Sequence, residues 1–385
     1  MERALDFNPT EQHAMIRSAA REFAEGEIRP RVRAMDEAGR FPRDLFRKLG
    51  EMGFLGVCFP AEYDGAAMST IDYTIIVEEI SRVDGSIGLG VAAHNSLCCT
   101  HIFLFGTEEQ RRKYLRPLAR GEYIGAWSLT EPTAGSDAGG TRTRAVKDGE
   151  HFVINGSKTF TTHGATGDVC VIFAVTDPEK GKHGILAFII EKEMPGFRAG
   201  KIEDKMGMRA SETAEVLMEN CRVHRSAMVG LEGEGFVNAM QILDGGRISI
   251  AALALGMAQG AYEAALAYSK QREQFGRPIS SFQAVQFMLA DMAVDIEASR
   301  WLTYRSAWMK DEGLRVTKAS AMAKLRASET ALRVADKALQ VMGGYGYTKE
   351  FPVEKFYRDV KLCTIGEGTS EMQRLVIARQ ILGEA

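Results

Sequence analysis

A single glutamate stands between two glycines near the C-terminal end of the sequence. Glu367 is flanked by Gly366 and Gly368, and a stretch follows that begins with Thr369 and Ser370, residue types that cap helix N-termini. A carboxylate that stabilises the start of a helix lies inside the first turn, whereas Glu367 lies just outside it. The two glycines let another molecule approach the carboxylate and its backbone closely. The spacing therefore predicts that Glu367 acts as a base.

Two further segments combine hydroxyl groups, aromatic rings and flexible backbone. Residues 127–139 begin as a strand at Trp127 and become a loop of small and hydroxyl side chains, which can approach a planar or phosphorylated ligand. Residues 155–165 present an aromatic ring and two threonines before a flexible turn, so Phe160 could cover a flat cofactor and a hydroxyl could bond a ring nitrogen. Taken alone, each segment is more typical of a plain surface loop or a threonine-rich strand.

Several common site patterns are absent from the sequence. It contains no P-loop, no H-E-x-x-H, no G-x-S-x-G and no G-x-G-x-x-G between a strand and a helix. Gly343, Gly344 and Gly346 follow a helical pattern, which favours a helix end and turn over a dinucleotide fingerprint. His94 and His101 could share a helix face, but a zinc site needs more ligands. We therefore expect buried core or interface histidines and no metal site.

The elements that must position these residues change type along the chain. The first third is helical, with start signals at Asn8-Pro9-Thr10-Glu11, where Asn8 is the expected cap, and at Thr107-Glu108-Glu109-Gln110. From about residue 123 to 228, short runs rich in Val, Ile, Thr and Phe alternate with turn residues, including Asp148-Gly149 and Asn155-Gly156. Strands without intervening helices predict a small barrel or sandwich.

Long helical segments with short connections return after Gly235, which predicts an antiparallel bundle. These segments are Phe236–Arg272, Phe282–Asp311, Leu314–Met342 and Ser370–Leu382. We therefore predict three domains: an N-terminal α-helical domain over 1–121, a middle domain of strands, a small barrel or sandwich, over 122–231 and a C-terminal α-helical bundle over 232–385.

Composition and charge exclude several classes of protein. The 385 residues carry 48 Lys and Arg against 51 Asp and Glu, a net charge of -3, so the basic excess of a nucleic-acid binder is missing. Ser86–Phe105 and Ile248–Tyr262 lack charge, but the first contains polar and glycine residues and the second is short, so we expect buried core helices and no membrane span. Six cysteines without a C-x-x-C pair, and an N-terminus without a cationic start or apolar core, favour a reduced, cytoplasmic setting.

The chain resembles the FAD-dependent acyl-CoA dehydrogenases over essentially its whole length. The most specific matches are Leu129-Thr130-Glu131-Pro132, Ala134-Gly135-Ser136-Asp137, and Arg358-Asp359 followed by Glu367-Gly368-Thr369-Ser370-Glu371. Supporting matches are Arg272 with Phe275-Gly276, and Gln340 with Gly343-Gly344-Tyr345-Gly346. The resemblance implies an α+β multidomain fold in which an α-helical domain, a middle β-barrel and a four-helix bundle follow in order. It also implies FAD between barrel and bundle, and a homotetramer built as a dimer of dimers in which a second subunit contributes to each site.

The activity that this resemblance implies is the α,β-dehydrogenation of an acyl-CoA thioester to the trans-2-enoyl-CoA. Glu367 would take the α-proton while a hydride passes from the β-carbon to flavin N5, and desolvation by the acyl chain would raise the pKa of Glu367. The backbone N–H of Glu367 and a flavin ribityl hydroxyl would hold the thioester oxygen. An electron-transferring flavoprotein would then accept the electrons.

The same resemblance assigns binding roles residue by residue. The positions that match FAD contacts are Trp127, Leu129, Thr130, Ser136, Phe160, Thr162, Arg272, Phe275, Gln340, Gly344, Thr369 and Glu371. Four of them would reach the FAD of the neighbouring subunit: Arg272, Phe275, Gln340 and Gly344. The positions that match substrate contacts are Ser136, Asp244, Arg247 and Gly368. The uncharged stretch Ser86–Phe105 is expected to form a wall of the acyl pocket.

Three departures from the family pattern bear on the substrate and the base. Phe160 replaces a tryptophan found in many members, which keeps an aromatic ring but weakens the inference about the path of electron exit. Gly366 stands where many members carry a tyrosine, so we expect a changed acyl pocket near the thioester. Some members carry the base on a bundle helix, but the matching residue is Gly246, which favours Glu367. Short or medium straight acyl chains are expected. The alternatives are a branched-chain substrate, oxidase or monooxygenase chemistry on the same fold, and a non-catalytic acyl-CoA-binding protein.

Overall fold

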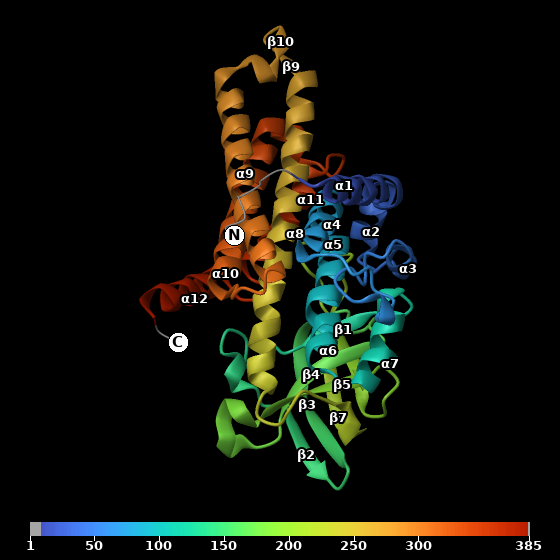
Figure 1. The fold of residues 1–385 in the computed structure, drawn as a ribbon. Helices are drawn as coiled ribbons and strands as arrows, with labels where there is room; N and C mark the ends of the chain where they lie inside the picture. Colours follow the sequence, from blue (N-terminus) through green and yellow to red (C-terminus); the bar gives the residue numbers. More distant parts are fainter. Residues whose placement is uncertain (1–8, 384–385) are drawn as a thin grey trace.

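The computed structural model describes residues 9–383 and shows helices, then one large sheet, then long helices. Figure 1 places the sheet at one end of the molecule, while α8 and α9 extend away from it toward the opposite end. The N-terminal helices are α1 (Glu11–Phe23), α2 (Val32–Ala38), α3 (Arg43–Glu51), α4 (Thr70–Ser81), α5 (Gly85–Ala92), α6 (Thr100–Phe105) and α7 (Glu108–Ala119). A π-helical segment, η4 (Ala93–Cys99), joins α5 to α6, so the uncharged stretch forms one continuous helical run.

Capping residues in the sequence set where several of these helices begin. Helix α1 begins after Thr10, whose side chain accepts a hydrogen bond from the His13 backbone N–H. The predicted cap, Asn8, lies outside the described residues, and the first helical residue is Glu11. The predicted start of α7 is confirmed, because Thr107 and Gln110 satisfy each other's backbone N–H groups.

The strands of the middle region form one eight-stranded sheet in the order β6-β7-β3-β2-β4-β5-β8, with β1 beside β4. They are β1 (Gly125–Ser128), β2 (Arg144–Asp148), β3 (His151–Thr162), β4 (Val169–Val175), β5 (Ile185–Glu191), β6 (Phe197–Ile202), β7 (Thr213–His224) and β8 (Met228–Val229). Strand β4 is buried on both faces. On one face Ile172 belongs to an apolar cluster with Phe152, and on the other Phe173 belongs to a cluster with Leu115 of α7. Burial on both faces explains why this strand is an uninterrupted apolar run.

The prediction of a turn at Asn155-Gly156 is wrong, because β3 continues through both residues. The pairing of β3 with β7 shifts register between Ile154 and Gly156, which is the signature of a β-bulge. Gly156 has φ +148°, and a Cβ added to it would lie 2.6 Å from Thr143 Oγ1. The glycine is therefore needed for a close approach between neighbouring strands rather than for a turn.

The C-terminal region is built on one long helix, α8 (Gly235–Gln271), whose 37 residues span about 55 Å at 1.5 Å per residue. It packs against α4, α9 and α10. The other helices are α9 (Gln283–Asp311), α10 (Thr317–Met342), α11 (Val353–Val360), which the sequence pattern did not indicate, and α12 (Ser370–Leu382). A two-stranded hairpin, β9 (Glu273–Gln274) with β10 (Arg277–Pro278), lies at the end of the bundle farthest from the sheet (Figure 1).

Two helical stretches within residues 9–383 are long and apolar enough to cross a membrane by length and composition alone: 85–105 and 235–271. In the fold, 83% and 67% of their most apolar windows are buried against the rest of the protein. This burial supports the interpretation that both are core helices.

Candidate active site

The side chain of Glu367 extends from the turn before α12 toward α8. Glu367 has φ +52° and Gly368 has φ +94°, so the chain makes a left-handed turn immediately before α12. A non-glycine residue in this conformation is uncommon and is found preferentially at functional sites. The residue as a whole is half-buried, yet its Oε2 atom is enclosed and has no hydrogen-bond partner in the described part of the chain. A buried carboxylate oxygen without a partner is costly, which marks it as a group kept for another molecule.

Burial determines the acidity of this carboxyl group. Loss of solvent raises the pKa of Glu367 to about 7, against the lowering effect of the positive charges of Lys324 and Arg247. A carboxylate with a pKa near neutrality is a stronger base than one in water and is still substantially ionised at pH 7. The local environment therefore suits proton abstraction.

Gly246 on α8 supplies the space that the carboxylate occupies. A Cβ added to Gly246 would lie 2.1 Å from Glu367 Oε2 and 3.1 Å from Leu97 in η4. One turn farther along α8, the Ser249 hydroxyl donates to Ser96 Oγ of η4 at 2.9 Å. Leu97 of the uncharged stretch therefore lies beside the carboxylate, and its role as a wall of the acyl pocket stays a prediction.

Asp244 and Arg247, the predicted substrate contacts on α8, form an ion pair with each other. Asp244 also accepts a hydrogen bond of 2.5 Å from the Thr317 hydroxyl of α10. The Arg247 side chain is buried, and its Nε atom has no partner among the described residues. Arg247 thus places a fixed positive charge and one free donor near Glu367.

On the sheet side, a buried ion pair shapes the loop that follows β1. The Glu131 carboxylate accepts from the backbone N–H groups of Arg142 and Thr143, at 2.7 and 3.0 Å, and from Lys158 Nζ at 2.7 Å. Lys158, on β3, is completely buried and also donates to the Leu129 carbonyl at 3.2 Å. Burial lowers the pKa of Lys158 to about 8, while Glu131 acts in the opposite direction. These contacts hold residues 129–131 in one conformation.

Two predicted cofactor contacts stand close together on β3. Phe160 has φ +56° and its side chain is 66% exposed, at a second register shift, between Lys158 and Thr161. A bulky residue at positive φ is strained, and an exposed aromatic ring has unfavourable hydration. Holding Phe160 exposed therefore lowers the stability of the fold, while the ring stays accessible to a ligand. Thr162 follows as a partly exposed hydroxyl. An aromatic face beside a hydroxyl suits a flat ring with polar edges.

The remaining residues on this side of the fold differ in exposure. Ser136 is exposed and Thr130 is half-buried, so both hydroxyls are open to a ligand, whereas Leu129 is buried. Trp127 is half-buried and turns its indole N–H to His101 Nδ1 at 3.4 Å. Thr369 caps α12, and Glu371 in its first turn is exposed.

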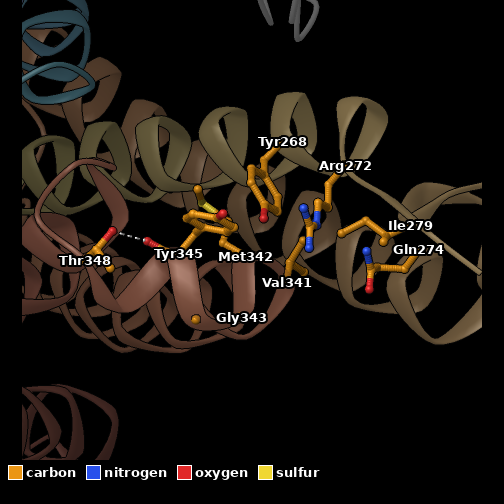
Figure 2. Close-up of a pocket in the computed structure, with 10 residues that line it drawn as sticks. Tyr268, Arg272, Gln274, Ile279, Val341, Met342, Gly343, Tyr345 and Thr348 are labelled. Atoms are coloured by element: carbon orange, nitrogen blue, oxygen red, sulfur yellow. Dashed lines mark hydrogen bonds between the residues drawn. The ribbon is translucent and has the colours of Figure 1, made fainter.

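The other four predicted cofactor contacts gather at the far end of the bundle. Arg272 and Gly344 line a hollow of about 510 Å³ between the end of α8 and the end of α10. Figure 2 shows the Arg272 side chain pointing from α8 toward Val341, beside the ring of Tyr345. Gln340, on the last turn of α10, is exposed, and Phe275 is 95% exposed at the hairpin tip with φ +53°.

The length of α8 separates this hollow from Glu367. Gly246 contacts the Glu367 carboxylate, and Arg272 ends the helix 26 residues later, so the two ends lie about 40 Å apart. No side chain bridges that distance. The predicted site residues therefore do not form one cluster within a single chain, because Arg272 and Gly344 lie at the far end of α8 from Glu367.

Sequence reasoning missed two buried lysines that contact predicted site residues: Lys158, which donates to the Leu129 carbonyl, and Lys324. Lys324 is on α10 and donates to the Gly368 carbonyl at 2.6 Å. A signal was present in the sequence, because Lys324 shares a helix face with Ser320, Ala321, Ala327 and Ser328, all buried. His94 and His101 are both buried, as expected, and within residues 9–383 no group of His, Cys, Asp and Glu could hold a metal ion.

Models of the three acyl-CoA dehydrogenase domains match the chain: the N-terminal domain at residues 10–122, the middle domain at 126–221 and the C-terminal domain at 233–382. The chain is 51% identical to the short-chain specific acyl-CoA dehydrogenase of Clostridium acetobutylicum over 98% of this chain and 100% of that protein.

Two solved structures share the fold. Butyryl-CoA dehydrogenase from Megasphaera elsdenii superposes with a TM-score of 0.96 at 43% identity, over 98% of this chain and 100% of that one. A chain from a structure of the electron transferring flavoprotein of Acidaminococcus fermentans superposes with a TM-score of 0.97 at 52% identity, over the same shares. The expected fold is confirmed, and the exposed ring of Phe160 with the hydroxyls of Thr130, Ser136 and Thr162 fits a flavin. The chain therefore belongs to the acyl-CoA dehydrogenase family of FAD-dependent oxidoreductases.

Proposed function

We propose that Glu367 is the base that takes the α-proton of a short-chain acyl-CoA in a dehydrogenation to the trans-2-enoyl-CoA. The observation that supports this most directly is the enclosed Oε2 atom, which has no hydrogen-bond partner within residues 9–383 and lies against Gly246. Its pKa of about 7 matches the requirement for a base that works near neutral pH.

The residues around Glu367 divide the remaining tasks. The left-handed turn at Glu367 and Gly368 lets the Glu367 backbone N–H hold the thioester oxygen, where negative charge develops as the α-proton leaves. Arg247, with its free Nε donor, supports the CoA arm near the thioester. Leu97 and η4 form the apolar wall that excludes water from the carboxylate.

FAD, when bound, supplies the acceptor for the hydride that leaves the β-carbon. Phe160 and Thr162 would hold its ring system, and the loop from Leu129 to Ser136 would add further contacts. The Glu131–Lys158 pair fixes the conformation of that loop. Thr369 and Glu371, at the start of α12, would contact its adenosine-pyrophosphate half.

The group around Arg272 would complete the FAD site of a second copy of the chain. The separation of about 40 Å along α8 is too large for Arg272 and Glu367 of one chain to contact the same part of one ligand. Arg272, Phe275, Gln340 and Gly344 carry a guanidinium, an exposed ring, an amide and open backbone, which suit a phosphate-bearing cofactor. This arrangement supports an assembly of at least two chains, and we propose a homotetramer.

Short acyl chains are the preferred substrates in this proposal. The relatives from Clostridium acetobutylicum and Megasphaera elsdenii are named for short-chain and butyryl substrates. The Ser96–Ser249 hydrogen bond lies one helical turn beyond Gly246 and joins the two walls there, which limits the depth available to an acyl chain. The electron acceptor we propose is an electron-transferring flavoprotein, supported by the relative from Acidaminococcus fermentans.

The test compares Glu367→Gln with the wild type, both purified with FAD, in anaerobic mixing with butyryl-CoA. The wild-type flavin should bleach and turn over, whereas the variant should keep its yellow FAD and lose about 10³-fold or more in turnover, because the amide cannot accept the proton. Glu350→Gln, an exposed glutamate elsewhere, serves as the control and should behave like the wild type. Turnover of Glu367→Gln within tenfold of the wild type would overturn the assignment.

A second measurement separates a dehydrogenase from an oxidase on the same fold. Reduced enzyme is mixed with air-saturated buffer and oxygen consumption is followed, in parallel with reduction of an electron-transferring flavoprotein. Slow oxygen consumption with fast flavoprotein reduction is expected, and the reverse would favour the oxidase alternative.

A further inference from the structure

Lys324 is a completely buried lysine on the face of α10 that packs into the bundle. Its neighbours on that face are the small residues Ser320, Ala321, Ala327 and Ser328, all buried as well. A buried ammonium group loses its hydration, and such groups are retained in proteins only where they are paired or have a task. The position of this one charge therefore requires an explanation.

The ammonium group of Lys324 meets the turn that carries the base. Lys324 Nζ donates to the Gly368 carbonyl at 2.6 Å, and Gln373 Nε2 donates to the same carbonyl at 3.0 Å and to the Glu367 carbonyl at 3.3 Å. Both Glu367 and Gly368 are at positive φ, so the turn is strained at Glu367 and needs external contacts to persist. Lys324 is the charged contact among these donors.

The charge of Lys324 also acts on the carboxylate itself. Lys158 neutralises a carboxylate directly at 2.7 Å, whereas the hydrogen bond of Lys324 ends on a carbonyl, which leaves its positive charge uncompensated by that partner. Its field acts together with that of Arg247 to lower the pKa of Glu367, against the larger effect of burial. The titratable and charged groups that face Lys324 are Cys363 of the preceding 3-10 turn, Glu367, Arg247 of α8 and Glu371 of α12.

We propose that Lys324 is a positioning residue for the base: its hydrogen bond to Gly368 holds the Glu367 turn, and its charge keeps the Glu367 carboxylate ionised. This proposal rests on the proposed role of Glu367. Burial alone would favour the protonated form of Glu367, which cannot accept the α-proton. The charge of Lys324 offsets part of that effect without touching the carboxylate, so Oε2 stays free for the substrate.

The two parts of this role are separable with three variants. Lys324→Gln keeps a donor near Gly368 but removes the charge, Lys324→Met removes both, and Gln373→Met removes a neutral donor to the same carbonyl. Lys318→Gln changes an exposed lysine of the same helix and is the matched control. Each enzyme is purified with FAD and assayed with butyryl-CoA from pH 5.5 to 9, with flavin content and thermal unfolding measured beside the rates.

Loss of the charge of Lys324 should move the acidic limb of the pH profile of kcat/KM. In Lys324→Gln and Lys324→Met, the limb should shift upward by about one pH unit, because an opposite charge that favoured the carboxylate is gone. At pH 6.5, kcat should fall about tenfold, with little change in KM for the acyl-CoA. Gln373→Met should lower kcat without moving the limb, and Lys318→Gln should match the wild type.

Several outcomes would overturn the proposal. An unmoved limb in Lys324→Gln, at unchanged flavin content, would show that the charge does not act on the base. Equal limb shifts in Lys324→Gln and Gln373→Met would show a purely structural effect. A wild type that turns over no acyl-CoA, or a fully active Glu367→Gln variant, would overturn the proposed function and with it the role of Lys324. If Lys324→Met does not fold, Lys324→Gln decides the question alone.

Discussion

Glu131 and Glu367 lie in different regions of the molecule, and their environments differ sharply. Glu131, on the sheet side, receives three hydrogen bonds, one of them from the buried ammonium of Lys158. These contacts hold the pKa of Glu131 below its ordinary value despite burial. Glu367, on the bundle side, has an enclosed oxygen that receives none from the described residues, and burial raises its pKa to about 7. One carboxylate is saturated by the fold, and the other is left for a ligand.

The comparison teaches how the fold assigns different tasks to the same side chain. A carboxylate with all its acceptors used stabilises a loop and cannot take a proton from a substrate at neutral pH. A carboxylate without partners is a better base, but it lowers the stability of the protein that contains it. Each glutamate stands near a buried lysine, and the difference lies in whether the ammonium touches the carboxylate or a neighbouring carbonyl.

The largest expected effect comes from removing the charge of Glu131. Glu131→Gln should lower the free energy of unfolding by about 3–5 kcal/mol, because Lys158 would remain buried without its counter-charge. The variant should also bind FAD more weakly, since the loop from Leu129 to Ser136 loses the Glu131–Lys158 ion pair. Urea unfolding of the purified protein, followed by circular dichroism, measures the change.

The double variant Glu131→Gln, Lys158→Met is the control for this result. Removal of both charges should recover part of the lost stability, because no unpaired buried charge remains. A loss below about 1 kcal/mol in Glu131→Gln would mean that this pair resembles an exposed ion pair, and the contrast with Glu367 would then fail.

The next effect in size is a stability difference that depends on pH. The pKa of Glu367 rises from an ordinary value of 4.5 to about 7 in the folded protein, so folding takes up a proton between these values. Wild-type stability should therefore fall as the pH rises from 4.5 through 7, relative to Glu367→Gln. The two proteins should agree near pH 4.5 and differ by about 2–3 kcal/mol at pH 8, with the variant more stable.

Glu131 should show the opposite dependence. Its lowered pKa contributes stability that is present above the ordinary value of 4.5 and is lost as the pH falls through the folded-state value. Urea titrations of wild type and Glu367→Gln at pH 5 and pH 8, and of wild type and Glu131→Gln at pH 5 and pH 3, compare the two slopes. A stability difference between wild type and Glu367→Gln that is the same at both pH values would contradict the raised pKa.

The smallest expected effect concerns the space beside the free carboxylate. In Gly246→Ala, the new methyl group would meet Glu367 Oε2 at 2.1 Å, so the carboxylate must move. We expect kcat for butyryl-CoA to fall about tenfold with FAD retained, since small misplacement of a reacting group is costly. Stability should change by about 1 kcal/mol or less, because the helix propensity of alanine offsets the crowding. Gly245→Ala, whose Cβ would approach only the flexible end of Lys310, is the control.

Periodicity predicted the architecture well wherever burial was the dominant force. The strand at Val169–Val175 and the ends of α8, α9 and α12 follow from apolar runs and helical spacing. The turn predicted at Asn155-Gly156 failed because the same glycine signal serves a strand bulge that packs against Thr143. The domain boundaries at 121/122 and 231/232 stay predictions.

The site was predictable where a side chain acts on a ligand, and less so where it acts on its own fold. Glu367 stood out through its flanking glycines, whereas Lys158 and Lys324 have no local motif and reveal themselves only by burial and by the carbonyls they reach. Arg272 and Gly344 lie together, far from Glu367, because of the length of α8. No short sequence motif indicates this arrangement. Long-range packing therefore determines the parts of the site that a linear reading misses.

Helix α8 also has a consequence for how the molecule unfolds. It packs against α4 of the N-terminal helices, against α9 and α10 of the bundle, and against β5 of the sheet. Melting of the bundle would strip the apolar cover from α4, so partly folded states that retain only one region are high in free energy. Backbone amides in α4, β5 and α8 should therefore exchange with solvent at similar rates, through the same global opening.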